Sequence, residues 1–188
     1  RAHIARETDW FAAASARVRE FGLALSAWTV CMHNSRLGEN HPNAIIEDAF
    51  GNPRPYALCP SNPAVRHYVR ALVEDLTRYP LTALLLEAFR YMDVVHGAHH
   101  ERWSIPLAPL ERTLLGLSFT ASDLAAARQA GVDGERVRAL VSAHLQAYFA
   151  AYPTIAPELP RNRNVFDERY PEVSAYRACL ESVMDALF

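Results

Sequence analysis

The stretch Leu81-Thr-Ala-Leu-Leu-Leu-Glu87-Ala-Phe89 decides the fold that we expect for this chain. Its apolar run has no polar alternation, which is typical of a parallel strand buried on both faces. The run stops at the carboxylate of Glu87. Because the carboxyl ends of strands form the ligand site in α/β proteins, Glu87 is a candidate site residue. A helix cap or an ion-pair partner is the alternative interpretation of this residue.

The segments before this stretch complete a βαβ unit over residues 23–89. Residues 23–30 are rich in strand formers and predict a first buried strand. Asn62 and Pro63 then predict the start of a helix with one apolar face. Residues 31–61 are rich in Asn, Gly, His and Pro and predict an unusually long loop. We expect the two strands to be parallel neighbours.

The other elements that we predict are helices. One covers residues 8–21, and residues 107–188 are mostly helical, with helix starts at Asp133 and Pro171 and a helix end at Gly131. Two parallel strands do not make an independent sheet. We therefore expect a single α/β domain of (β/α)8 TIM-barrel type, present as an incomplete set of βα units with a helical C-terminal part. A full barrel takes roughly 250 residues, and this chain has 188.

Composition limits the partners that we expect. The net charge is −2, and no basic stripe gathers the arginines, so nucleic acid is not predicted as a partner. No apolar run approaches the ~20 residues of a membrane span. The cysteines Cys31, Cys59 and Cys179 are odd in number and share no metal-binding spacing, which favours a reducing, cytoplasmic location. Small molecules are the expected partners, and a homo-oligomer is compatible with these features.

Several short motifs follow one another in an order that is informative as a set. They are Ala27-Trp-Thr-Val30, His33-Asn34, His41-Pro42, Phe50-Gly51-Asn52, Leu58-Cys-Pro-Ser-Asn-Pro-Ala-Val-Arg66, Leu84-Leu-Leu-Glu-Ala-Phe89 and His96-Gly-Ala-His-His-Glu101. Their order resembles that of bacterial glycoside-hydrolase-like TIM barrels of a largely uncharacterised subgroup, over about residues 20–133. The resemblance implies a barrel that acts on or binds a carbohydrate, with this chain supplying about its third to fifth units.

The resemblance also assigns roles to residues. Glu87 becomes the candidate catalytic residue, and the second carboxylate of a glycosidase would be Asp93, Glu101 or a residue outside this chain. Leu86 stands where many retaining glycosidases carry Asn, which weakens the case for Glu87 as general acid. The candidate substrate-binding residues, which offer aromatic faces or hydrogen bonds to a sugar, are Trp28, His33, Asn34, His41, His96, His99, His100, Glu101 and Trp103, with Tyr56 as a further aromatic candidate.

Two other functions stay open at this point. A metal-dependent hydrolase could use the histidines and the carboxylate of residues 96–101, although their spacing does not match H-E-x-x-H. A sugar-binding or scaffold protein without chemistry is the second alternative. Related barrels carry Cys-x-Cys-x-x-Cys where this chain has Ser118, Thr120 and Asp123, so we expect no structural zinc there and no cofactor.

Overall fold

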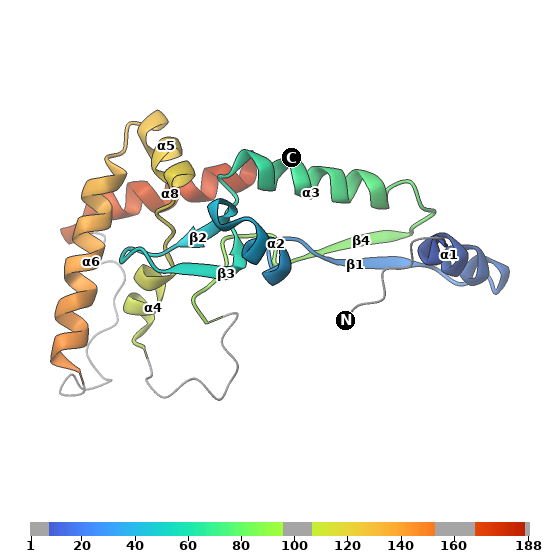
Figure 1. Cartoon of the computed structure of the whole chain (residues 1–188), viewed down its shortest axis with the longest axis horizontal. Helices are drawn as coiled ribbons and strands as arrows, with labels where there is room; N and C mark the ends of the chain where they lie inside the picture. The colour runs from blue at the N-terminus through green and yellow to red at the C-terminus, as the bar shows by residue number, and fades with distance from the viewer. Residues whose placement is uncertain (1–7, 96–106, 153–167, 187–188) are drawn as a thin grey trace.

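The computed structural model describes residues 8–95, 107–152 and 168–186. The molecule is elongated, with a two-stranded arm at one end, a group of helices at the other and a β-hairpin between them (Figure 1). Helix α1 (Trp10–Glu20) lies at the tip of the arm. Gly22 follows it at φ 66°, a conformation that suits glycine at a helix end, so the predicted first helix is confirmed.

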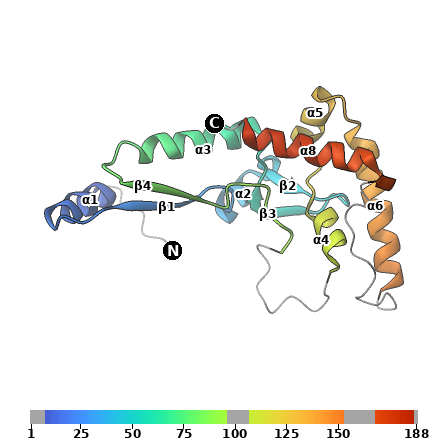
Figure 2. The same ribbon diagram turned by 180° about the vertical axis from the view of Figure 1, so that it is seen from behind.

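Strands β1 (Ser26–Val30) and β4 (Ala83–Glu87) pair in parallel and form the arm, as predicted. Helix α3 (Pro63–Leu76) begins at the expected N-cap, where the Asn62 side chain accepts a hydrogen bond from the Ala64 N–H at 2.9 Å. Figures 1 and 2, which view the molecule from opposite sides, both show α3 running along one side of this sheet. The predicted βαβ arrangement of strand, helix and strand is therefore present.

The two strands are buried on one face only, which corrects the prediction of burial on both faces. Leu86 packs against the buried cluster that includes Val65 and Val69 of α3. On the opposite face, Trp28 lies beside Leu85 in the register, and their exposed fractions are 71% and 57%. The apolar run was correctly taken as a parallel strand, but one helical layer is all that covers it among the described residues.

A β-hairpin and two short helices occupy the region predicted as a long loop, and that prediction was wrong. Helix α2 (Ser35–Asn40) and the 3-10 helix η1 (Pro42–Ala44) precede strands β2 (Ile45–Glu47) and β3 (Pro53–Leu58), which pair antiparallel. The Asp48 carboxylate accepts hydrogen bonds from the backbone N–H groups of Phe50 and Asn52, both at 2.9 Å, and so builds the connecting turn. These elements are too short to produce a periodic sequence pattern.

Helices α4 (Pro109–Gly116), α5 (Ala121–Gln129), α6 (Gly134–Ala151) and α8 (Pro171–Asp185) form the other end of the molecule. The predicted starts at Asp133 and Pro171 are confirmed. Their core is one apolar cluster in which the rings of Phe119 and Tyr176 stack at 5.0 Å. The Tyr176 hydroxyl donates to the Ser118 carbonyl at 2.7 Å, so this core also fixes the segment between α4 and α5.

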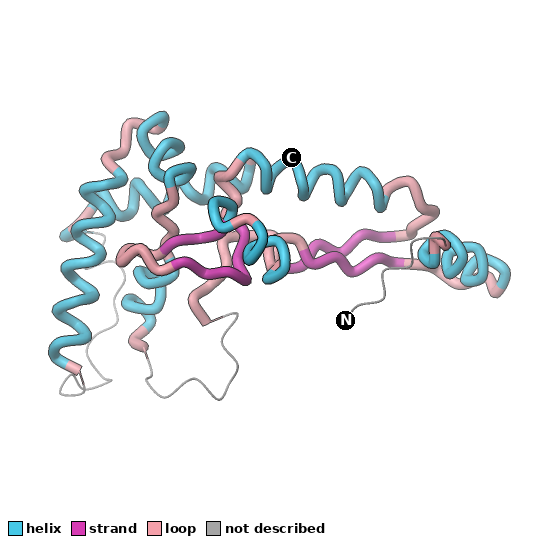
Figure 3. Tube along the Cα trace, in the orientation of Figure 1, coloured by secondary structure: helices cyan, strands magenta, loops and turns pink. Residues whose placement is uncertain are grey.

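The TIM-barrel prediction is wrong. The described residues contain four strands in two separate two-stranded sheets, and one of the sheets is antiparallel (Figure 3). A barrel needs eight parallel strands in one closed sheet. The chain is a mixed α/β protein in which a parallel pair, a hairpin and a helical group pack in series. Among the helices that the structure describes, none is both long and apolar enough to cross a membrane.

Candidate functional site

Glu87 lies at the end of β4, as predicted, but it lines neither of the pockets described below. Its register partner is Val30, so its side chain is on the exposed face of the sheet that also carries Trp28. Its carbonyl accepts from the Cys31 N–H at 2.9 Å. Ala88, the next residue, has φ 49°, an unfavourable backbone conformation for alanine. Trp28, a predicted substrate contact, is exposed on this face and lines neither of the pockets described below.

The structure brings only part of the predicted sugar site together. The His33 ring packs edge-on against Tyr56 with 5.9 Å between centroids. The Asn34 side chain caps α2 by accepting from the Leu37 N–H at 3.0 Å. His41 lies at the end of α2 and lines a pocket. The predicted residues that lie outside the described part of the chain are His96, His99, His100, Glu101 and Trp103.

One pocket that could hold a ligand lies between α2, η1 and the first turns of α3, and we call it the α2 pocket. Its volume is about 460 Å³. It has an apolar floor with a rim of amide, imidazole and phenol groups, and no charged residue lines it. Leu58 and Val65 lie in its floor, and its rim carries Asn40, His41, Asn43 and Tyr68.

Two asparagines join the walls of the α2 pocket. Asn34, which caps α2, donates from Nδ2 to the Tyr68 hydroxyl of α3 at 3.4 Å. Asn62, which caps α3, donates from Nδ2 to the Asn43 carbonyl at 2.9 Å. Each asparagine therefore caps a helix with its side-chain oxygen and donates a hydrogen bond to another segment from its side-chain nitrogen. The walls are held in place before a ligand binds, which lowers the entropic cost of binding.

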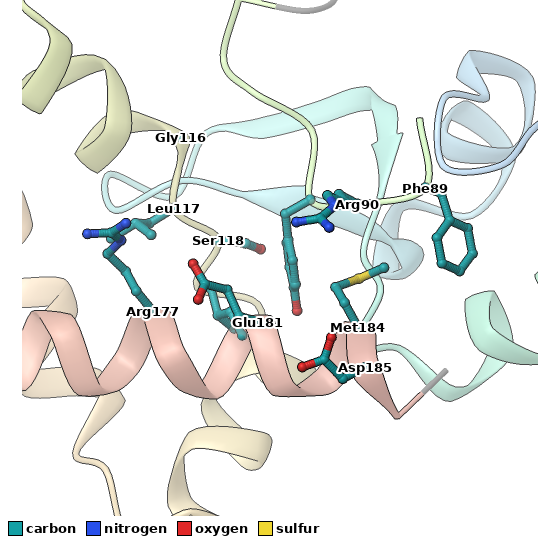
Figure 4. Close-up of a pocket in the computed structure, with 11 residues that line it drawn as sticks. Phe89, Arg90, Gly116, Leu117, Ser118, Arg177, Glu181, Met184 and Asp185 are labelled. Carbon is teal, nitrogen blue, oxygen red and sulfur yellow. The ribbon is translucent and has the colours of Figure 1, made fainter. Parts of the chain in front are cut away.

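The second pocket lies between α8 and the segment that follows β4, and we call it the α8 pocket (Figure 4). Its volume is about 420 Å³. Phe89, Arg90 and Tyr91 come directly after the carboxyl end of β4, which is where ligands of α/β proteins bind. Glu181 and Asp185 project into it from α8. No residue that the sequence singled out as a substrate contact lines this pocket.

A buried carboxylate fixes one wall of the α8 pocket. Asp123, the third residue of α5, has no exposed surface. Its Oδ2 accepts hydrogen bonds from the Ser118 hydroxyl at 2.5 Å, the Thr120 hydroxyl at 2.7 Å and the Thr120 N–H at 3.0 Å. Its Oδ1 accepts from the Tyr91 hydroxyl at 2.6 Å. Tyr91 and Ser118 both line the pocket, so the Asp123 carboxylate determines where they stand.

The same network immobilises Tyr91 and Cys59. The Tyr91 hydroxyl donates its hydrogen bond to Asp123. The Ser61 hydroxyl, which lies 2.5 Å from the Tyr91 hydroxyl, therefore donates to Tyr91. The Cys59 thiol lies 3.5 Å from both Asp123 oxygens. Burial, reinforced by the Asp123 charge, raises the pKa of Cys59 to about 12, so this thiol is not a nucleophile at neutral pH. The network is structural, because the Tyr91 hydroxyl is already bonded to Asp123 and Ser61.

Asp93, one of the candidates for a second carboxylate, is occupied in an ion pair. Arg112 of α4 donates to it from Nη2 at 2.8 Å and from Nε at 3.1 Å. Partial burial raises the pKa of Asp93, but the bonds from Arg112 outweigh it and the net shift is downward. A carboxylate held ionised in this way does not donate a proton near neutral pH. Asp93 therefore joins α4 to the segment after β4.

Sequence reasoning reached the α2 pocket through His41 and missed the α8 pocket. The α8 pocket is built by α8 and by residues after β4, about 90 positions apart, and single-sequence patterns do not report such pairs. Ser118, Thr120 and Asp123, which the sequence analysis named only as standing in place of zinc-binding cysteines, converge in the buried network, and that network was not predicted. Comparison of the chain with protein families, curated proteins and solved structures finds no match.

Proposed function

We propose that this chain binds a neutral carbohydrate in the α2 pocket. The observation that carries the proposal is an apolar floor ringed by uncharged hydrogen-bonding groups, with His41, Asn40 and Asn43 at the rim. A sugar ring has apolar C–H faces and hydroxyl groups around its edge, so it matches such a lining. The ligand class also agrees with the one that the resemblance to glycoside-hydrolase-like proteins implies.

The size and rigidity of the pocket support a small ligand. A volume of about 460 Å³ lies within the roughly 300 to 1,000 Å³ typical of small-molecule sites. The imidazole of His41 and the side-chain amide of Asn43 make no hydrogen bond to any described residue, so both are available to hydroxyl groups. The bridges from Asn34 and Asn62 keep the pocket open.

We propose that the residues of this pocket bind the carbohydrate and do not cleave it. Hydrolysis of a glycosidic bond needs two carboxylates on either side of the bond, at about 5 to 5.5 Å or about 6.5 to 9.5 Å from each other. The α2 pocket has no carboxylate in its lining, and Glu87 is not part of it. The free thiols of Cys31, Cys59 and Cys179 support a reducing, cytoplasmic setting for this binding.

The test is a titration of the ¹⁵N-labelled chain with glucose, galactose, mannose and N-acetylglucosamine, and with their short oligomers. At least one sugar should shift the backbone and side-chain amide signals of Asn40 and Asn43. His41→Ala should weaken its binding about fivefold, the value of one hydrogen bond of about 1 kcal/mol. The matched control is His67→Ala, since His67 is exposed on α3 and does not line the pocket.

The variant Glu87→Gln separates this proposal from strand-end catalysis. We expect sugar binding to be unchanged, because Glu87 lies outside the α2 pocket. If no sugar moves the signals of the pocket, or if His41→Ala and His67→Ala weaken binding equally, the proposed site is wrong. Turnover of an oligosaccharide that disappears in Glu87→Gln would show that the chain is an enzyme instead.

A further inference from the structure

We propose that the α8 pocket is a second ligand site, and that it takes a small zwitterion of the α-amino acid class. The proposal is independent of the carbohydrate proposal, because the two pockets share no lining residue. It begins from the charges at the rim. Arg90 stands on the segment after β4, and Arg177, Glu181 and Asp185 stand on the opposite wall, on α8 (Figure 4).

These charges are close to one pocket but do not neutralise one another. Within the described residues, Arg90, Glu181 and Asp185 make neither an ion pair nor a side-chain hydrogen bond. Elsewhere in the structure, charges that meet across elements do pair, as Arg138 does with Glu47 at 3.1 Å. Arg90 and the two carboxylates therefore lie on opposite sides of the pocket without pairing. A ligand that carries both an ammonium and a carboxylate group would satisfy both walls at once.

The position of the two carboxylates specifies which end of the ligand meets α8. Glu181 and Asp185 are four residues apart, so they lie on one helix face and repel each other. They also lie in the last two turns of α8, where the helix dipole is negative and disfavours anions, and no basic residue stands in the last turn. Arg66 donates to the Ala186 carbonyl at 2.8 Å but pairs with neither carboxylate. Arg177 lies one turn before Glu181 on the same helix, and an ammonium group between Glu181 and Asp185 would relieve the repulsion that remains.

The rest of the pocket suits an apolar side chain on that zwitterion. Phe89, Leu117, Leu180 and Met184 contribute apolar surface. Tyr91 adds its ring, and its hydroxyl is already used by Asp123 and Ser61. Since buried hydrogen bonds hold this wall, its shape does not need to form on binding. L-Leucine is therefore a suitable probe.

Two charge-deleted analogues make the test specific. Calorimetric titration of the full chain with L-leucine should show 1:1 binding, with L-leucinamide and N-acetyl-L-leucine at least tenfold weaker. Glu181→Gln should weaken L-leucine about fivefold and leave N-acetyl-L-leucine unchanged, because that analogue has no ammonium group. Arg90→Gln should weaken L-leucine and leave L-leucinamide unchanged. The matched control, Glu74→Gln on exposed α3, should affect none of them.

The outcomes that overturn the proposal are distinct from those for the carbohydrate site. If L-leucine does not bind at 10 mM, about ten times the upper end of the usual KM range of roughly 1 μM to 1 mM, the proposal is rejected. Equal affinities for L-leucine and N-acetyl-L-leucine would reject the role of the α8 carboxylates. Competition between L-leucine and a bound sugar would show one shared site, whereas the structure assigns two.

Discussion

Replacing Asp123 with asparagine should lower the free energy of unfolding by about 3 kcal/mol, although the two side chains have nearly the same shape. The carboxylate accepts three hydroxyl hydrogen bonds, from Ser118, Thr120 and Tyr91. A hydrogen bond to a charged group contributes about 1.5 to 3 kcal/mol to stability, and a hydrogen bond between neutral groups contributes about 0.5 to 1.5 kcal/mol. Each of the three hydrogen bonds therefore becomes weaker by about 1 kcal/mol when the carboxylate is replaced by an amide. In addition, the amide NH2 of asparagine must face one of the three donors.

The assay is urea unfolding followed by circular dichroism, with the slope m compared between the two proteins. An equal slope with a lower midpoint would show that stability changed and that the native fold did not. Asp133→Asn is the matched control, because Asp133 is an exposed N-cap with one hydrogen bond, to the Arg136 N–H at 3.0 Å. Asparagine caps as well as aspartate, so the control should change stability by less than about 0.5 kcal/mol. A loss below about 1 kcal/mol for Asp123→Asn would refute the reasoning.

Three further predictions concern packing, thiol reactivity and pH. Gly38→Ala should destabilise the fold by about 3 kcal/mol in urea unfolding, because its added Cβ would lie 1.8 Å from a β3 carbonyl oxygen. Gly116→Ala is the control, and it should change stability little, because the atom nearest to its added Cβ is 4.0 Å away. Native Cys59, whose pKa burial raises to about 12, should resist iodoacetamide at pH 8 and react once urea is added. The Asp93 carboxyl signal should titrate below its usual pKa, since bonds from Arg112 outweigh partial burial, and Arg112→Ala should raise that pKa. The lowered pKa means that this contribution to stability is present above about pH 4 and is lost as the pH falls through the folded-state value.

The parts of the fold that the sequence predicted are those with strong local signals. Asn62 with Pro63 and Asp133 gave correct helix starts, because caps and first-turn prolines act within a few residues. The parallel pairing of β1 with β4 also followed from the strand–helix–strand order. The hairpin was missed, since β2 has three residues and its turn depends on Asp48 rather than on a glycine pair.

The candidate sites were less predictable for a physical reason. His41 was identified through the His-Pro motif of the resemblance, and it does line a pocket. Glu87 was identified by the rule that ligands bind at the carboxyl ends of strands, yet it lines neither the α2 pocket nor the α8 pocket. The rule assumes a sheet covered on both faces, which places the carboxyl ends of the strands in a crevice. Here the described residues cover the β1–β4 pair on one face only, and Glu87 lies on the other face, although the residues after it do line the α8 pocket.

The open face of β1 and β4 suggests another interpretation of Glu87. Trp28, Val30 and Leu85 share that face and are 71%, 42% and 57% exposed. If each exposes on the order of 100 Å² of apolar surface, covering all three would stabilise the chain by about 7 kcal/mol at 25 cal/mol per Å². That is comparable with the whole stability of a typical domain, about 5 to 15 kcal/mol. Glu87 lies next to Val30 in the register, so any surface that covered these side chains would also meet its carboxylate. Glu87 therefore belongs to this open apolar face and not to the lining of the α2 or α8 pocket.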